Sequence, residues 1–359
     1  MKERTKESRR RLNSLILLIA FTAIMLIVST YAWFSTQKDV TISNLTGEVQ
    51  VAEGLEISID GETWSQVIDL EKVDIKTDAY DTNKNLLPEE MLPVSTLGET
   101  GGTDLSMLRG NVTNSIELSD IIACDETVKN ISDAKYPGYI AFDIFLKNTS
   151  RGDTPNTLQL NSNSSVGVLE SGGKAESGVQ NTVRVGFALY NSVADTLATA
   201  TEIISSTTGD SSTISNVAIW EPNSNDHVPY IVKNNNKIVG KTFADQEKVD
   251  TFALKKTAIG QTISNIYDWG GTITHLAKQN TLQTTKTDVG NYVIKEGVQD
   301  LLSATDGTSP FQLQSNKISR VRVYVWLEGQ DVDCTNYASH GGGIEVDIGL
   351  VKDANVGSK

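Results

Sequence analysis

The sequence predicts an all-β fold: an antiparallel, jelly-roll-like β-sandwich with long loops, preceded by one N-terminal hydrophobic helix. Two observations predict it. Several segments of the body alternate apolar and polar residues with a period of two, which is typical of antiparallel sheets that place one face on a core. One long uncharged apolar run lies near the N-terminus, directly after a basic stretch. Two half-apolar sheets packed face to face make a sandwich.

The first 34 residues have the composition of an export or membrane-anchoring segment. Residues 1–13 form a basic n-region, and residues 14–34 carry no charge. These 21 uncharged residues would span roughly 31 Å as a helix, close to the hydrocarbon thickness of a bilayer. Flanking positive charge stays in the cytoplasm, so we expect residues 35–359 to form a domain that is extracellular or on the cell surface.

Two interpretations of this segment remain open. Thr30 and Ala32 occupy positions −3 and −1 of a small-residue site, which predicts a signal peptide cleaved after Ala32. Alternatively the helix is retained as a signal anchor with a cytoplasmic N-terminus, and Tyr31, Trp33 and Phe34 form an interfacial aromatic belt. The length of the apolar run favours the anchor, whereas the small residues favour cleavage.

Charge is distributed unevenly along the chain. The whole sequence has a formal net charge of −14. Residues 1–34 hold six basic and two acidic side chains, and the rest holds 25 basic and 43 acidic, a net charge of −18. A body of this sign argues against a nucleic-acid partner, because such binding requires a basic surface.

The period-two alternation is strongest in five segments of the body. In residues 319–329, valines alternate with Arg320, Arg322, Tyr324 and Trp326, and we expect this second set to face solvent. Weaker strand patterns occur at 214–220, 230–232 and 237–239. Residues 116–124 and 289–302 are compatible with helix. The five strong segments are 40–60, 138–148, 182–190, 319–329 and 343–351.

Long polar stretches separate the strong segments, at 78–115, 149–181 and 191–316. The simplest organisation is one sandwich built from both ends of the body, with a subdomain inserted at about 191–316. Two separate domains are the alternative, because no Pro-rich or Gly/Ser linker divides the chain cleanly.

The two cysteines, Cys124 and Cys334, are a candidate disulfide. In an exported chain a disulfide can persist. A bridge would close a loop of about 210 residues, which the chain-entropy account values at about 5 kcal/mol. Two free, half-buried thiols are the alternative interpretation.

An acidic group follows the predicted strand at 319–329. Glu328, Asp331 and Asp333 could offer oxygen ligands to Ca²⁺, although a solvated acidic turn is the simpler interpretation. We expect no other cofactor. The sequence contains no H-E-x-x-H zinc helix, G-x-S-x-G elbow or P-loop, so we expect no enzymatic activity.

Ser29–Phe34 (STYAWF) closes the apolar run, and Val49–Ile59 (VQVAEGLEISI) follows it. In these two segments the N-terminal region resembles the TasA/camelysin family of secreted biofilm-matrix and cell-surface proteins of Gram-positive bacteria. Asn148–Ser150 resembles a strand ending of the family, and Val321–Cys334 and Ile344–Leu350 are similar to strands at the end of many clostridial-type surface proteins of the same general layout. The resemblance to the TasA/camelysin family implies that a dedicated signal peptidase removes the signal and that the body is a jelly roll.

The resemblance also implies self-association into filaments by strand donation, in which a segment of one subunit completes the sheet of the next. The expected donor is 34–51, with Val40 and Ile42 seated in the acceptor. An ordinary intramolecular edge strand is the alternative. We therefore expect a structural protein of the cell surface or biofilm matrix. A membrane-tethered adhesin or ligand-binding ectodomain, with recognition in loops 78–115 and 191–316, is the rival.

Overall fold

The computed structural model describes seven main stretches of the chain and a few short segments between them. The predicted n-region and apolar helix at 1–34 lie outside the described residues. None of the helices within the described part is long and apolar enough to cross a bilayer. The main stretches are 45–69, 79–96, 102–133, 135–169, 179–220, 310–328 and 343–353, less residues 53, 89, 106, 115 and 116. The short segments are 222, 230–234, 237–241, 254–256, 280–282 and 299–300.

Two large β-sheets form the body, which confirms the all-β prediction. The first contains β1 (Leu45–Thr46), β2 (Glu48–Val51), β4 (Val67–Asp69), β9 (Asn156–Leu160), β10 (Ser165–Val168), β17 (Gln299–Asp300), β18 (Gln312–Leu313) and β20 (Ile344–Lys352). The second contains β3 (Leu55–Ser58), β8 (Ile140–Asn148), β11 (Val183–Asp195), β12 (Ile214–Trp220) and β19 (Lys317–Leu327).

The spatial order of the strands differs from their order along the chain. The first sheet runs β17-β9-β20-β2-β4, with β1 and β10 also paired to β20 and β18 to β9. The second runs β12-β11-β19-β8-β3. The five strong alternating segments supply β2 and β3, then β8, β11, β19 and β20, so these strand predictions are confirmed.

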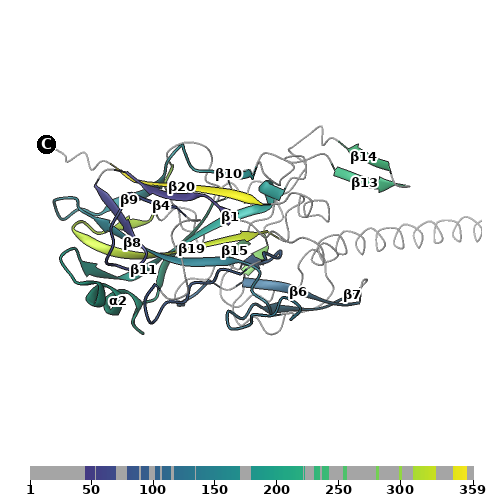
Figure 1. The fold of residues 1–359 in the computed structure, drawn as a ribbon, viewed down its shortest axis with the longest axis horizontal. Coiled ribbons are helices and arrows are strands. Elements are labelled where there is room, and N and C mark those ends of the chain that lie inside the picture. Colours follow the sequence, from purple (N-terminus) through teal and green to yellow (C-terminus); the bar gives the residue numbers. More distant parts are fainter. Residues whose placement is uncertain are drawn as a thin grey trace, which may run out of the picture.

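One hydrophobic core joins the two sheets, which Figure 1 shows as stacked layers. Alternate residues of β8, β11 and β19 on the inner face pack against alternate residues of β9 and β20. Burying each such side chain contributes about 1.5–3 kcal/mol, so the alternation read from the sequence is what holds the sheets together. Core residues include Phe142, Ile144, Phe187, Val323, Val325, Leu158, Ile344, Val346 and Ile348.

The outer face of the second sheet is also buried, contrary to the expectation of a solvated face. Arg320, Arg322, Tyr324 and Trp326 are at most 8% exposed. A segment that we call the strap, residues 79–96, lies against this face and ends in β5 (Ser95–Thr96). β5 pairs with β6 (Met107–Asn114), whose Met107 joins the same buried cluster, and β6 pairs with β7 (Glu117–Ala123). The stretch 78–115 was predicted as a long polar loop, but its described residues form a cover.

The α-helix α2 (Ala200–Thr208; Figure 1) packs on the same outer face, near Tyr80 at the N-terminal end of the strap. Its Ile203 is buried against Tyr80, Phe145 and Ile318. The helix begins with a capping box, in which Thr199 accepts from the N–H of Glu202 while the Glu202 side chain accepts from the N–H of Thr199.

Several weaker predictions have mixed outcomes. The segment 116–124 is not helical, because Glu117–Ala123 forms β7, paired antiparallel with β6. A hairpin of β13 (Tyr230–Asn234) and β14 (Lys237–Lys241) confirms the two short strands predicted there. The remaining pair is β15 (Leu254–Lys256) with β16 (Asn280–Leu282). Only 299–300 of the segment 289–302 is described, as β17.

The first sheet is not wholly antiparallel, which corrects the prediction. β1 and β2 run parallel to β20, with Leu45 opposite Ile344 and Val51 opposite Leu350. Residues 45–51 of the expected donor segment therefore pair within their own chain, and β2 lies inside the sheet between β20 and β4. Donor candidates Val40 and Ile42 lie outside the described residues.

Gly47 allows β1 and β2 to follow β20 in one register. Its φ is +134°, and a Cβ there would lie 1.9 Å from the carbonyl oxygen of Val346. Only glycine adopts this backbone without strain, and only glycine leaves room for the neighbouring strand. At this point the N–H of Glu48 donates to the carboxylate of Asp347, 3.3 Å away.

We expect Gly47→Val to lower the free energy of unfolding by about 2 kcal/mol or more, because it adds backbone strain and a steric clash. Denaturant unfolding of the purified protein measures this. Gly167→Ala is the matched control: Gly167 pairs with Glu345 on the other side of β20, and a Cβ there has no neighbour within 4 Å. Equal effects of the two changes would contradict the assignment.

Candidate functional site

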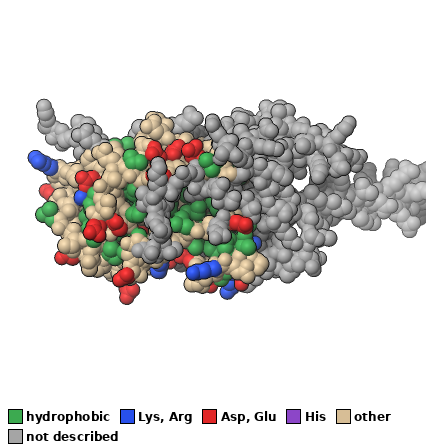
Figure 2. All heavy atoms as spheres, viewed as in Figure 1, with side chains coloured by type: hydrophobic (Ala, Val, Ile, Leu, Met, Phe, Trp, Pro, Cys, Tyr) green, Lys and Arg blue, Asp and Glu red, His purple; other side chains and the backbone are tan. Residues whose placement is uncertain are grey.

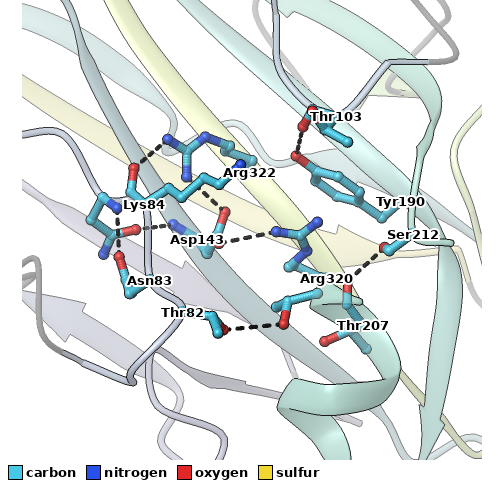
Figure 3. Close-up of polar contacts among 12 residues, drawn as sticks. Thr82, Asn83, Lys84, Thr103, Asp143, Tyr190, Thr207, Ser212, Arg320 and Arg322 are labelled. Atoms are coloured by element: carbon cyan, nitrogen blue, oxygen red, sulfur yellow. Dashed lines mark hydrogen bonds and ion pairs between the residues drawn. The ribbon is translucent and has the colours of Figure 1, made fainter. Parts of the chain in front are cut away.

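The most concentrated polar chemistry among the described residues is a buried group of charges on the outer face of the second sheet. Asp143 on β8 and Arg322 on β19 are register partners. Arg322 Nη1 lies 3.2 Å from Asp143 Oδ1, and Arg320 Nη1 lies 3.2 Å from Asp143 Oδ2. Figure 3 shows both guanidinium groups converging on this carboxylate. Because one strand carries both arginines at alternate positions, both side chains lie on the same face.

The strap supplies the remaining partners. Tyr80 Oη donates to Asp143 Oδ2 at 2.6 Å. Arg322 Nη2 donates to the carbonyl oxygen of Lys84 at 2.5 Å, and the backbone N–H of Asp143 donates to Asn85 Oδ1 at 2.9 Å. We call Tyr80, Asp143, Arg320 and Arg322 the arginine–aspartate cluster. It joins the strap to the centre of the sheet.

Burial and charge act in opposite directions on Asp143, which is 1% exposed. Burial alone would raise the pKa of this carboxyl, but the charges of Arg322 and Arg320 and the hydrogen bond from Tyr80 outweigh it, so the pKa is lowered. Burial, followed by the charge of Asp143, raises the pKa of Tyr80 well above its ordinary value. The cluster therefore holds a carboxylate and a protonated phenol at neutral pH.

Aromatic rings and a second carboxylate surround the cluster. The guanidinium of Arg320 stacks 3.4 Å from the ring centroid of Tyr190, whose hydroxyl donates to the carbonyl of Thr103. Arg322 Nη2 lies 3.8 Å from Glu126 Oε2, and burial raises the pKa of Glu126. Arg322 thus lies near two acidic side chains, Asp143 and Glu126, and Arg320 lies between Asp143 and the ring of Tyr190.

The geometry of the arginine–aspartate cluster favours a structural role for it, holding the strap to the second sheet, over a catalytic role. Asp143 is enclosed by the sheet and the strap, and a group that acts on a substrate needs access to it. In the described part of the chain, no three His, Cys, Asp or Glu side chains are placed to hold a metal ion.

Glu328 is the described member of the predicted calcium group. It is 2% exposed, and its carboxylate accepts from Trp326 Nε1 at 3.1 Å. Its backbone N–H donates to the carbonyl of Thr182. Glu328 is therefore not part of a solvated turn. Asp331 and Asp333 lie outside the described residues, so the calcium site stays a prediction.

Cys124 lies beside Arg109 and has no disulfide partner among the described residues, and as a thiol its pKa is raised by burial to about 12. Cys334 lies outside the described residues, so the disulfide is still a prediction. The cleavage candidate Ala32 also lies outside them.

The cluster was missed at the level of sequence, although a signal for it is present. Asp143 interrupts the apolar run of β8, and it has the parity of the outward positions. Arg320 and Arg322 have that parity on β19. Opposite charges on the outward faces of two strong strands indicate a pair wherever those strands are neighbours.

Comparison with known proteins adds no assignment: no family model, no curated protein and no solved structure matches this chain.

We expect Asp143→Asn to lower the free energy of unfolding by about 3–5 kcal/mol, because it leaves two guanidinium groups buried without their carboxylate. Thermal or denaturant unfolding measures the loss. The matched control is Asp195→Asn on β11. It removes an exposed carboxylate that lies 3.3 Å from Lys317, a residue of the same strand, β19, that carries Arg320 and Arg322. We expect little change there, since solvent screens that pair. A similar small effect for Asp143→Asn would contradict the role given to the cluster.

The contribution of Asp143 should depend on pH. Because its folded-state pKa is lowered, its stabilisation is complete above the unfolded pKa of about 3.9 and is lost as pH falls through the lower folded value. The difference in unfolding free energy between the native protein and Asp143→Asn should be largest near neutral pH and shrink below about pH 4. A difference that is constant from neutral to strongly acidic pH would rule this out.

Proposed function

We propose that the chain is a non-enzymatic, exported structural protein of the cell surface or biofilm matrix, which assembles into filaments by strand donation. The basic n-region and the uncharged run at 14–34 support export. The described part of the body supports the structural role, because the arginine–aspartate cluster within it is closed to solvent and fastens the strap to the second sheet.

The observation that carries the assembly step is the way the chain enters the first sheet. β1 runs parallel to β20 from Leu45 onward, and β4 pairs with β2 only from Glu48. Among the described residues, no strand pairs with β1 on the side away from β20. An unpaired strand edge accepts any extended segment. Residues 34–44 precede this edge directly in sequence, and they are the segment that we propose as the donor to the same edge of another copy.

We propose a jelly-roll-like wrap for the body. The chain passes between sheets from β8 to β9, from β10 to β11 and from β19 to β20. The last two long strands enter between earlier ones: β19 lies between β8 and β11, and β20 lies between β9 and β2. These passages between the two sheets, with β19 and β20 inserted between earlier strands, support a jelly-roll-like wrap. The parallel pairing of β2 with β20 is a departure from a wholly antiparallel jelly roll.

Surface charge bears on how copies meet. Acidic side chains on the visible face of Figure 2 form several separate groups rather than one patch. The net charge of −18 on residues 35–359 makes copies of the body repel one another. Strand pairing supplies directional backbone hydrogen bonds against that repulsion, so a paired edge is a better contact than a charged face.

A membrane-tethered adhesin or ligand-binding ectodomain is the second candidate, favoured by the length of the apolar run. One of its expected recognition loops, 78–115, is largely occupied in covering the second sheet. Mass spectrometry of the N-terminus separates the two proposals. A chain beginning near Trp33 in the medium indicates a released subunit, and an intact Met1 or Lys2 in the membrane fraction indicates the tether.

We expect removal of residues 34–44 from the processed protein to abolish filaments while the body stays folded, as seen by electron microscopy and circular dichroism. The double change Val40→Asp with Ile42→Asp should have the same effect, because both side chains would enter the acceptor. Thr41→Asp with Ser43→Asp is the matched control, since alternate residues of a strand face the other way. Filaments formed without residues 34–44 would refute strand donation.

A further inference from the structure

We propose that β1, β2 and β20 form a mechanical clamp, which resists tension applied between the N-terminal side of β1 and the C-terminal side of β20. Such a load-bearing function goes beyond the proposed structural role. It concerns the single folded chain and does not depend on filament formation.

The parallel pairing determines how force acts on these strands. Leu45 is opposite Ile344 at one end of the ladder, and Val51 is opposite Leu350 at the other. Both strands run in the same direction, so a pull on the N-terminal side of β1 and a pull on the C-terminal side of β20 act at opposite ends. The strands must then slide past each other, and the bonds between them are loaded together. In an antiparallel terminal pair, both pulls would act at one end and the bonds would break one after another.

Side-chain burial opposes the same sliding motion. Val49 and Ile348 are register partners, and both lie in the core with at most 1% exposure. A slip of one residue turns every side chain of a strand to the opposite face of the sheet. Sliding β2 along β20 would therefore carry Val49 out of the core, in addition to breaking backbone hydrogen bonds.

The C-terminal end of β20 is fastened to both sheets. Lys352 Nζ donates to the carbonyl oxygen of Gly54 at 2.8 Å and to Asn148 Oδ1 at 3.0 Å, at the ends of β3 and β8. The N–H of Asp353 donates to the carbonyl oxygen of Thr157, and the N–H of Thr157 donates to Asp353 Oδ1 at 2.7 Å. These contacts hold the end of β20 where tension would reach it first.

The other strand of the clamp is held from its far side. β4 pairs with β2 from Glu48 to Gln50, and the N–H of Val51 donates to the carbonyl oxygen of Gln66 at 2.8 Å. β10 and β9 pair with β20 along its opposite edge. Both clamp strands are thus supported by neighbours, and a pull between their opposite ends loads the ladder between them directly.

Single-molecule force spectroscopy of the full-length chain tests the clamp, with handles attached in one of two geometries. Handles at Asn44 and Ala354 pull across the ladder in shear. Handles at Glu53 and Ala354 pull from the same end of β2 and β20 and peel them apart. We expect a high-force unfolding peak in the first geometry and its loss in the second. Equal unfolding forces in the two geometries would overturn the proposal, because forced unfolding reports the barrier along the loaded path.

A pair of variants places the resistance in this ladder. Gln50→Pro removes an N–H from β2 opposite Gly349, whereas Gly167→Pro removes one from β10 opposite Glu345, outside the path of the load. In the first geometry we expect Gln50→Pro to lose the high-force peak and Gly167→Pro to keep it. The same loss in both variants, or in neither, would overturn the assignment. If Gln50→Pro fails to fold, the comparison of the two geometries still decides the question.

Discussion

A carboxylate buried on the outer face of a sheet requires positively charged side chains and hydrogen-bond donors beside it, and in this structure β19 and the strap supply them. Asp143 lies in the middle of β8, where most residues are apolar. Its charge would be costly in an apolar interior without Arg320 and Arg322 beside it. Two buried guanidinium groups in turn need acceptors and stacking partners, which come from the strap, Glu126 and Tyr190. The strap is therefore part of the fold, and the second sheet is buried on both faces.

The pairing of strands from the two ends of the described chain is a second constraint on the fold. β2 and β20 are 299 residues apart in sequence at every paired position. β20 lies between β2 and β9 in the first sheet, and β19 lies between β8 and β11 in the second, so both late strands pair with strands that come much earlier in the chain. Such non-local pairing is slow to form, because loop closure costs entropy before the contacts compensate for it. Once formed, the arrangement places the first and last described strands side by side inside one sheet.

Sequence patterns predicted the strong strands because inner-face residues alternate with the period of a strand. Phe142, Phe187, Val323 and Ile348 are buried as that pattern requires. The expectation failed on the opposite face, since alternation identifies two faces but does not say what covers the second one. The segment 117–123 was compatible with helix by composition, and pairing with β6 made it a strand. The arginine–aspartate cluster was visible only as isolated charges, because the neighbour relation of β8 and β19 depends on topology.

The sequence by itself determined the strand-forming segments, the side of each that enters the core, the acidic body and the apolar run that precedes it. All of these depend on local residue order. The tertiary structure decided which strands are neighbours, that β1 and β2 run parallel to β20, and that Asp143 meets two arginines from a strand more than 170 positions away. Those facts arise from contacts between distant segments, whose energies depend on packing and burial that no local pattern records.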